Sequence, residues 1–233
     1  MKHLKRILGI FAVVVVICAV SVTIWQWDAI QAVYIAVTKD PEAIGERMEE
    51  IKEKNELTLQ GYNVDVAAPT FEQTEALLYG QITPEVVKES LQLDAVIDQP
   101  ETKADETVED EATQLVNACT AELYMCQIDL MADLGELYAE TQARWVSLGA
   151  GRNSATKQQF IKQGLQKCYS LEDSTDAAVQ HILDQYRSKL TAINADDKVL
   201  DELWDIYVEE KNSQKAYYLS QYMDQQMDGY DIK

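Results

Sequence analysis

Three of the four cysteines, Cys119, Cys126 and Cys168, are the residues best suited by type to covalent chemistry. Cys119 and Cys126 are two helical turns apart, about 10.5 Å along an axis, which is beyond the reach of a disulfide. Cys168 falls on the next predicted helix, so Cys126–Cys168 is the favoured bridge. It requires a loop or bend at the start of that helix, because simple rise leaves the two about 12 Å out of register. The alternative is three buried thiols acting as small apolar side chains.

The sequence holds none of the spacings that mark a catalytic or metal site. A Cys-x-x-Cys pair, a Gly-x-Ser-x-Gly turn, a P-loop, a Gly-x-Gly-x-x-Gly motif and a His-Glu-x-x-His motif are all missing from it. The two histidines, His3 and His181, do not combine with the cysteines into a four-ligand zinc pattern. We therefore predict that the protein is not an enzyme, with no catalytic residue, no cofactor and no bound metal.

Aromatic side chains crowd the last predicted helix, at Trp204, Tyr207, Tyr217 and Tyr218. Such a group suits a cage around a quaternary ammonium ion, because the faces of aromatic rings attract cations. Packing between helices is the commoner use of the same residues. We keep these four as candidates for a ligand or partner contact and favour the packing role.

The elements that must position these residues begin with an apolar run from Ile7 to Trp25. At about 1.5 Å per residue it spans roughly 28 Å, close to the hydrocarbon thickness of a bilayer. Lys5 and Arg6 precede it, and Trp25 and Trp27 close it, as expected at the two membrane interfaces. The pattern predicts a single transmembrane anchor with a cytoplasmic N-terminus and an extracytoplasmic remainder.

A cleaved secretory leader is the alternative reading of this run. The segment Ala19-Val20-Ser21 has small residues at the positions that a signal peptidase requires, so cleavage after Ser21 would release a secreted protein. The apolar character continues past that point, and the tryptophans suit an interface. These two features favour the anchor.

Charge and composition bound the class of protein and of partner. The chain carries 20 Lys and Arg against 40 Asp and Glu, a net charge of −20, which argues against binding to nucleic acid. With only 9 Gly and 4 Pro in 233 residues, it is expected to be helical. Solubility explains the acidity most simply, and a small cationic ligand or basic peptide is the sharper alternative.

We predict an all-α protein in four parts. Residues 1–38 form the cytoplasmic tip, the anchor and its extension, and residues 39–97 form a small helical juxtamembrane element, with a capping box at Thr70 and Gln73. Residues 98–112 are acidic and lack aromatics, which is typical of a flexible linker. Residues 113–230 form the main extracytoplasmic domain.

The main domain is predicted from one long apolar stripe. Its residues recur with a mean step of about 3.6, which indicates a nearly straight helix of some forty residues: Cys119, Leu123, Cys126, Leu130, Leu134, Leu137, Thr141, Trp145 and Leu148. A turn at 149–153 leads to a second helix, and a turn at 194–197 leads to a third that runs to about residue 227. Short connections make neighbours antiparallel, so we expect a long, coiled-coil-like antiparallel three-helix domain.

Parts of this domain resemble a group of membrane-anchored helical proteins of Gram-positive bacteria that have no assigned activity. The likeness covers roughly residues 115 to 222 and is carried by the runs 119–124 and 209–218 and by the long helix ending near Trp145. In that group a cysteine near the position of Thr175 pairs with the position of Cys119. Here Cys126 and Cys168 each lie seven residues inward, which would suit a bridge moved two turns along the same helix pair.

Together these observations predict a membrane-anchored extracytoplasmic interaction or scaffold protein of the bacterial cell envelope. Its partners would be the membrane, through the N-terminal helix, and a protein of the envelope, with no nucleic acid. The oligomeric state stays open. The alternative is a sensory or regulatory ectodomain that binds a small cationic ligand or a basic peptide.

Overall fold

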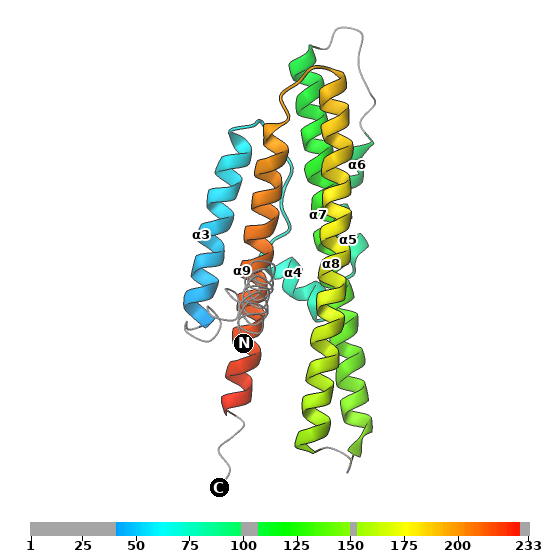
Figure 1. Ribbon diagram of the computed structural model, residues 1–233. Helices are drawn as coiled ribbons and strands as arrows, with labels where there is room; N and C mark the ends of the chain where they lie inside the picture. Colours follow the sequence, from blue (N-terminus) through cyan, green and yellow to red (C-terminus); the bar gives the residue numbers. More distant parts are fainter. Residues whose placement is uncertain (1–40, 99–106, 150–152, 229–233) are drawn as a thin grey trace, which may run out of the picture. The chain divides into compact units, whose positions relative to one another are not determined.

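The protein is helical throughout the part of the chain that the structure describes. This computed structural model describes residues 41–98, 107–149 and 153–228 (Figure 1). The helices are α3 Pro41–Gln60, α4 Phe71–Leu78, α5 Pro84–Ser90, α6 Leu93–Ile97, α7 Val108–Ser147, α8 Ser154–Ala192 and α9 Lys198–Asp228. The predicted all-α class is therefore confirmed for these residues, with no strand among them.

The predicted anchor lies outside the described residues, together with Lys5, Arg6, Trp25 and Trp27. Of the helices in the described ranges, none is both long enough and apolar enough to cross a bilayer.

The chain divides into two compact units that differ from the predicted segmentation. One unit holds residues 57–204, and the other combines residues 1–56 with residues 205–233. Most of α9, which we expected to be the third helix of the main domain, therefore belongs to the same unit as most of α3. Each unit is described here by itself.

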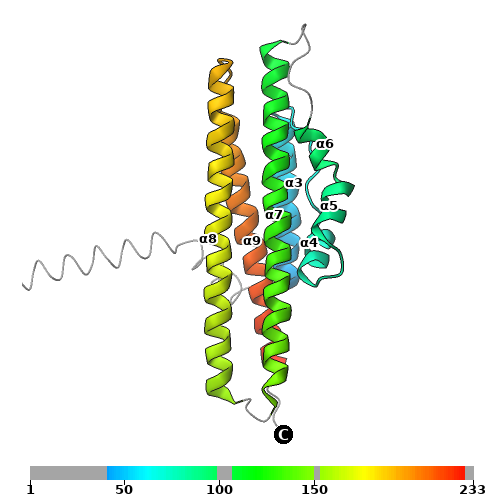
Figure 2. The ribbon, with the colours of Figure 1, turned by 90° about the vertical axis from the view of Figure 1, so that its right-hand side faces the viewer.

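In the unit of residues 57–204, α7 and α8 form an antiparallel hairpin, and α4, α5 and α6 pack on α7 (Figure 2). Figure 2 shows these short helices on the side of α7 away from α8, so α7 is covered on two sides. The core is built where the three layers meet. Its deeply buried side chains include Leu77, Val87, Leu93, Cys119, Ala121, Ile128, Met131, Val179, Tyr186, Leu190 and Leu200.

Gly135 lets α4 approach α7 closely. A Cβ atom at this position would lie 2.7 Å from the carbonyl oxygen of Leu78 and 2.8 Å from that of Leu77. Both carbonyls stand in the last turn of α4, and that of Leu77 accepts from the Gly80 N–H at 3.0 Å. The missing side chain therefore allows the end of α4 to lie directly on the backbone of α7.

α7 begins in the latter part of the predicted linker, a part that its sequence also allows to be helical. The helix begins at Val108, within the segment 98–112, because Thr107 caps it. The Thr107 hydroxyl accepts from the Asp110 N–H at 3.2 Å, and the Asp110 carboxylate accepts from the Thr107 N–H at 3.1 Å. This reciprocal capping box satisfies two donors and outweighs the local acidity that had indicated disorder. The predicted box at Thr70 and Gln73 is present at the start of α4.

Replacing Thr107 with alanine should lower the free energy of unfolding by about 1 kcal/mol, because the first turn of α7 loses its cap. Hydrogen exchange measured by mass spectrometry should show faster exchange confined to residues 108–112. Thr83 supplies a control, because it stands at the N-cap of α5 but makes no side-chain cap hydrogen bond. Thr83→Ala should leave α5 almost unchanged, and equal effects of the two substitutions would contradict the capping argument.

In the other unit, α3 and α9 pair antiparallel. The Lys54 ammonium lies 2.9 Å from the Glu209 carboxylate, and near the opposite end of α3 Ile44 packs with Ala216 and Tyr217. Asn55, which is 3% exposed, donates from Nδ2 to the Glu210 carboxylate at 3.1 Å. Burial raises the pKa of Glu210, and the Asn55 amide opposes that shift by binding the charged form.

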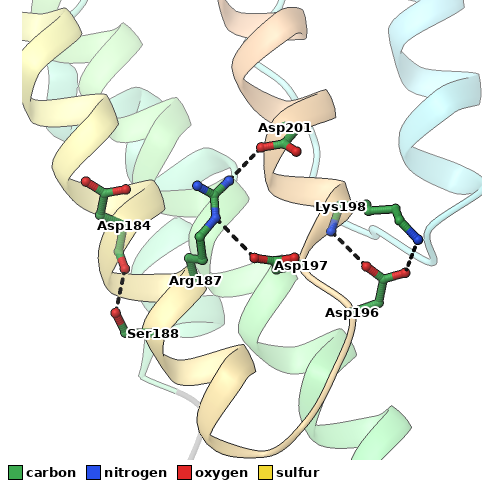
Figure 3. A network of polar contacts seen from close by, with 7 residues as sticks. All are labelled: Asp184, Arg187, Ser188, Asp196, Asp197, Lys198 and Asp201. Carbon is green, nitrogen blue, oxygen red and sulfur yellow. Dashed lines mark hydrogen bonds and ion pairs between the residues drawn. The ribbon is translucent and has the colours of Figure 1, made fainter.

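An arginine ties the end of α8 to the beginning of α9 (Figure 3). The Arg187 guanidinium lies 3.1 Å from the Asp197 carboxylate and 2.6 Å from that of Asp201. Asp196 accepts from both the backbone N–H and the ammonium of Lys198, at 3.1 and 3.0 Å. These groups are largely exposed, so each pair contributes little to stability and mainly fixes the direction of the turn.

Candidate interaction surface

The hairpin of α7 and α8 has a core along only part of its length. Among the side chains that the structure describes, which leave out those of Ser154, Gln158 and Ile161, none of α7 is buried beyond Gly135 and none of α8 is buried before Val179. We call this stretch, residues 136–178, the outer hairpin. Two helices alone cannot enclose a side chain on all sides. At the start of this stretch the Tyr79 ring meets that of Tyr138 edge to face, with centroids 6.2 Å apart.

The outer hairpin leaves large apolar side chains in contact with solvent. Four are between 41% and 59% exposed: Tyr138, Val146, Leu165 and Tyr169. A single exposed apolar residue needs no explanation, but a group on one projecting pair of helices is typical of an interaction surface.

Aromatic and cationic groups hold the end of the outer hairpin together. Trp145 of α7 and Phe160 of α8 meet edge to face, with ring centroids 5.7 Å apart, and the Arg144 guanidinium lies 5.3 Å from the Phe160 centroid. The Lys167 ammonium pairs with the Glu140 carboxylate at 3.0 Å. Lys167 holds the pKa of Glu140 below its usual range through this hydrogen bond, so the Glu140 carboxylate stays charged at neutral pH.

The end of the outer hairpin is the basic part of an acidic protein. Residues 141–171 contain no Asp or Glu but five basic residues: Arg144, Arg152, Lys157, Lys162 and Lys167. The remaining residues hold 15 Lys and Arg against all 40 Asp and Glu. We call residues 141–171 the basic tip. Arg152 falls outside the described residues, and the other four lie on α7 and α8.

The predicted bridge between Cys126 and Cys168 is not found: the structure holds both, and Cys119, as thiols. The helix register explains this. Glu140 lies level with Lys167, so Cys126 lies level with a residue near position 181, about 13 residues and roughly 20 Å from Cys168. Asn153 caps α8 by accepting from the Thr156 N–H at 3.0 Å, so α8 starts without the loop or bend that the bridge requires. A disulfide cannot span that separation.

Cys119 belongs to a buried polar group between α7 and α8. It is 0% exposed, and burial, with a smaller contribution from the Glu122 carboxylate, raises its pKa to about 12. Tyr186, 2% exposed, donates its hydroxyl proton to the Glu122 carboxylate at 2.7 Å. Burial first and that hydrogen bond second raise the pKa of Tyr186, while the Lys189 ammonium lies 4.2 Å from its ring centroid. A thiol with a raised pKa is a poor nucleophile, so this group serves packing rather than chemistry.

We expect Cys119 to resist alkylation in the folded protein. At pH 8 a thiol of pKa about 12 has about a thousandfold less thiolate than one of pKa 9.0, and its burial adds a steric barrier. Iodoacetamide labelling followed by peptide mass spectrometry should find Cys119 unlabelled until denaturant is added. The half-buried Cys126 provides the comparison and should label first. Labelling of both at the same rate would contradict the described core.

The four aromatic candidates are divided between the two units. Trp204 belongs to the unit of residues 57–204, and Tyr207, Tyr217 and Tyr218 belong to the other. Tyr217 and Tyr218 meet edge to face with centroids 5.4 Å apart, and the Lys211 ammonium lies 5.2 Å from the Tyr207 centroid. Ten residues of helix separate Tyr207 from Tyr217 by about 15 Å, too far to line one small cage.

Sequence reasoning missed the basic tip, although the signal was present in the sequence. The net charge of the whole chain was used to assign partners, and this average hides a run of 31 residues without one acidic side chain. A count of Asp and Glu in successive windows would have found it.

No family model, no curated protein and no solved structure matches this chain.

Proposed function

We propose that the protein is a membrane-anchored extracytoplasmic interaction module whose contact surface is the outer hairpin with its basic tip. The N-terminal apolar run supplies the anchor, and the acidic remainder stays soluble on the extracytoplasmic side. The likeness to membrane-anchored helical proteins of Gram-positive bacteria supports an envelope location. The partner is a protein with an acidic surface, since the tip is cationic.

The observation that carries this proposal is the coincidence of two properties in one stretch of the hairpin. The outer hairpin has exposed apolar side chains and no buried ones among its described residues, and its end is free of acidic residues. An interface needs apolar area for affinity and complementary charge for specificity. A hairpin that served only to extend the fold would need neither exposed apolar side chains nor an end without acidic residues.

The test combines topology with contact mapping in cells. A photo-reactive amino acid at Val146 should form adducts with a partner protein on intact cells, whereas the same group at the exposed Ser188, outside the outer hairpin, should not. Protease added to intact cells should digest the domain. Adducts of equal yield at both positions would overturn the contact surface, and protection from protease until lysis would overturn the extracytoplasmic location.

A further inference from the structure

Charge along α8 separates into two halves. From Ser154 to Leu171 the helix carries Lys157, Lys162 and Lys167 and no acidic residue. From Glu172 to Tyr186 it carries four acidic residues and no Lys or Arg. Anionic groups are favoured at the N-terminus of a helix, so the helix dipole does not account for a basic first half. A different interaction must favour this arrangement.

A basic, an aromatic and an acidic residue follow one another along one face of α8. Lys162, Tyr169 and Asp176 follow one another at intervals of seven, which keeps them within about 40° of each other around the helix axis. The exposed Asp173 lies on the same face, one turn before Asp176. The face therefore reads basic, aromatic, acidic in order, with the aromatic residue in the middle.

This face is directed away from α7. Phe160 and Lys167, which contact α7, lie about 140–160° around the helix from Lys162. Lys162 is exposed, and Leu165 and Tyr169 are 41% and 43% exposed. Two apolar side chains and two charges of opposite sign are thus presented outward from the same side of α8.

We propose that this face is an antiparallel homodimer contact, in which α8 of one copy pairs with α8 of a second about a twofold axis through Tyr169. In that register Lys162 of each copy lies level with Asp176 of the other and one turn from its Asp173. The two Tyr169 rings meet at the axis, and each Leu165 packs one turn away. A twofold contact requires such a self-complementary surface, and the basic–aromatic–acidic order supplies it.

The proposal rests on the proposed function, since it names a second copy as a partner of the outer hairpin. Asp176 is half-buried, and Lys162 is exposed. Two such partly exposed ion pairs and a small apolar centre give weak association, with a dissociation constant on the order of tens of micromolar. Confinement to a membrane raises the effective concentration, so weak pairing suffices for anchored copies. Pairing about Tyr169 uses basic and acidic halves equally, which explains why both are present on one helix.

Charge exchange between two variants tests the pairing. The full chain is purified in a non-ionic detergent, and its molar mass is measured by light scattering at 50 and 500 mM NaCl. Wild type should dimerise at 50 mM and dissociate at 500 mM, because salt screens exposed pairs. Lys162→Glu and the double substitution Asp173→Lys/Asp176→Lys should each weaken self-association at least about tenfold, because each places like charges opposite one another. An equimolar mixture of the two should dimerise again, since both contacts of the mixed dimer then join opposite charges.

Two further variants fix the surface and the register. Gln163→Glu introduces an acidic residue about 100° away from Lys162 and should leave dimerisation unchanged. Tyr169→Cys should form a covalent dimer on mild oxidation at 50 mM NaCl and much less at 500 mM. Monomeric wild type up to about 200 μM, or dimers that neither Lys162→Glu nor the double substitution Asp173→Lys/Asp176→Lys weakens, would overturn the proposal. Adducts between Val146 and another protein in cells would then leave the proposed function standing with a different partner.

Discussion

Replacing Gly135 with alanine is expected to lower the free energy of unfolding by roughly 2 kcal/mol. The new methyl group would stand 2.7 and 2.8 Å from two carbonyl oxygens at the end of α4, closer than real Cβ atoms approach backbone oxygen. Neither oxygen belongs to a flexible side chain, so α4 or α7 must move. Overpacking of this kind costs about 1–3 kcal/mol or more, which exceeds the gain of about 1 kcal/mol from placing alanine in a helix. Urea unfolding followed by circular dichroism measures the difference.

Gly164 is the matched control for Gly135. It also lies inside a long helix of the same hairpin, but a Cβ atom there would meet nothing within 4 Å. Gly164→Ala should therefore raise the free energy of unfolding by about 0.5–1 kcal/mol through helix propensity alone. A loss of stability from Gly135→Ala together with a gain from Gly164→Ala would locate the effect in the contact between α4 and α7. A gain in stability from Gly135→Ala would show that α4 does not lie where the structure places it.

The long helices were predictable because their apolar residues repeat with the helical period over many turns. The stripe from Cys119 to Leu148 predicted a helix of some forty residues, and α7 has 40. Gly149, which has a positive φ, follows α7, and the Asn153 cap begins α8. Local signals of this kind need no knowledge of the rest of the chain.

The partner of each helix was not predictable in the same way. The apolar residues of α9 predict that the helix packs against another helix, but they do not say which one. Its partner in the structure is α3, more than 150 residues earlier in the chain. Glu209 and Glu210 pair with Lys54 and Asn55 of α3, and no local sequence pattern predicts this pairing. Short connections favour packing between helices that are neighbours in the sequence. That rule assigned the whole of α9 to the unit of α7 and α8, whereas its residues from 205 onward belong to the unit of α3.

The cysteine prediction was wrong for a related reason. Residue types and the order of the helices suggested that Cys126 and Cys168 were close, but the axial register depends on how tightly the turn closes. Glu140 of α7 lies level with Lys167 of α8, and this register separates the thiols by roughly 20 Å. A bridge needs an accuracy of about 1 Å, which periodicity alone does not provide.

The buried thiol and phenol between α7 and α8 should make the protein sensitive to alkaline pH. Both groups have a pKa that is higher in the folded protein than in the unfolded chain, because burial disfavours their charged forms. The folded state therefore keeps protons that the unfolded chain releases, and stability falls as the pH rises. For Cys119, with a pKa raised from 9.0 to about 12, the contribution is complete below pH 9 and is lost between pH 9 and pH 12.

The expected loss from Cys119 alone is about 3 kcal/mol between pH 8 and pH 11, and Tyr186 adds to it above pH 10. Urea unfolding at a series of pH values measures the slope. Cys119→Ala removes one titrating group from both states, and Tyr186→Phe removes the other, so each variant should flatten the alkaline limb even though it lowers stability at pH 7. Tyr138→Phe provides the control, because that ring is 51% exposed and lies outside the buried group of Cys119 and Tyr186. Identical alkaline slopes for wild type and Cys119→Ala would show that this thiol does not stand in the core between α7 and α8, since only its burial separates the two pKa values.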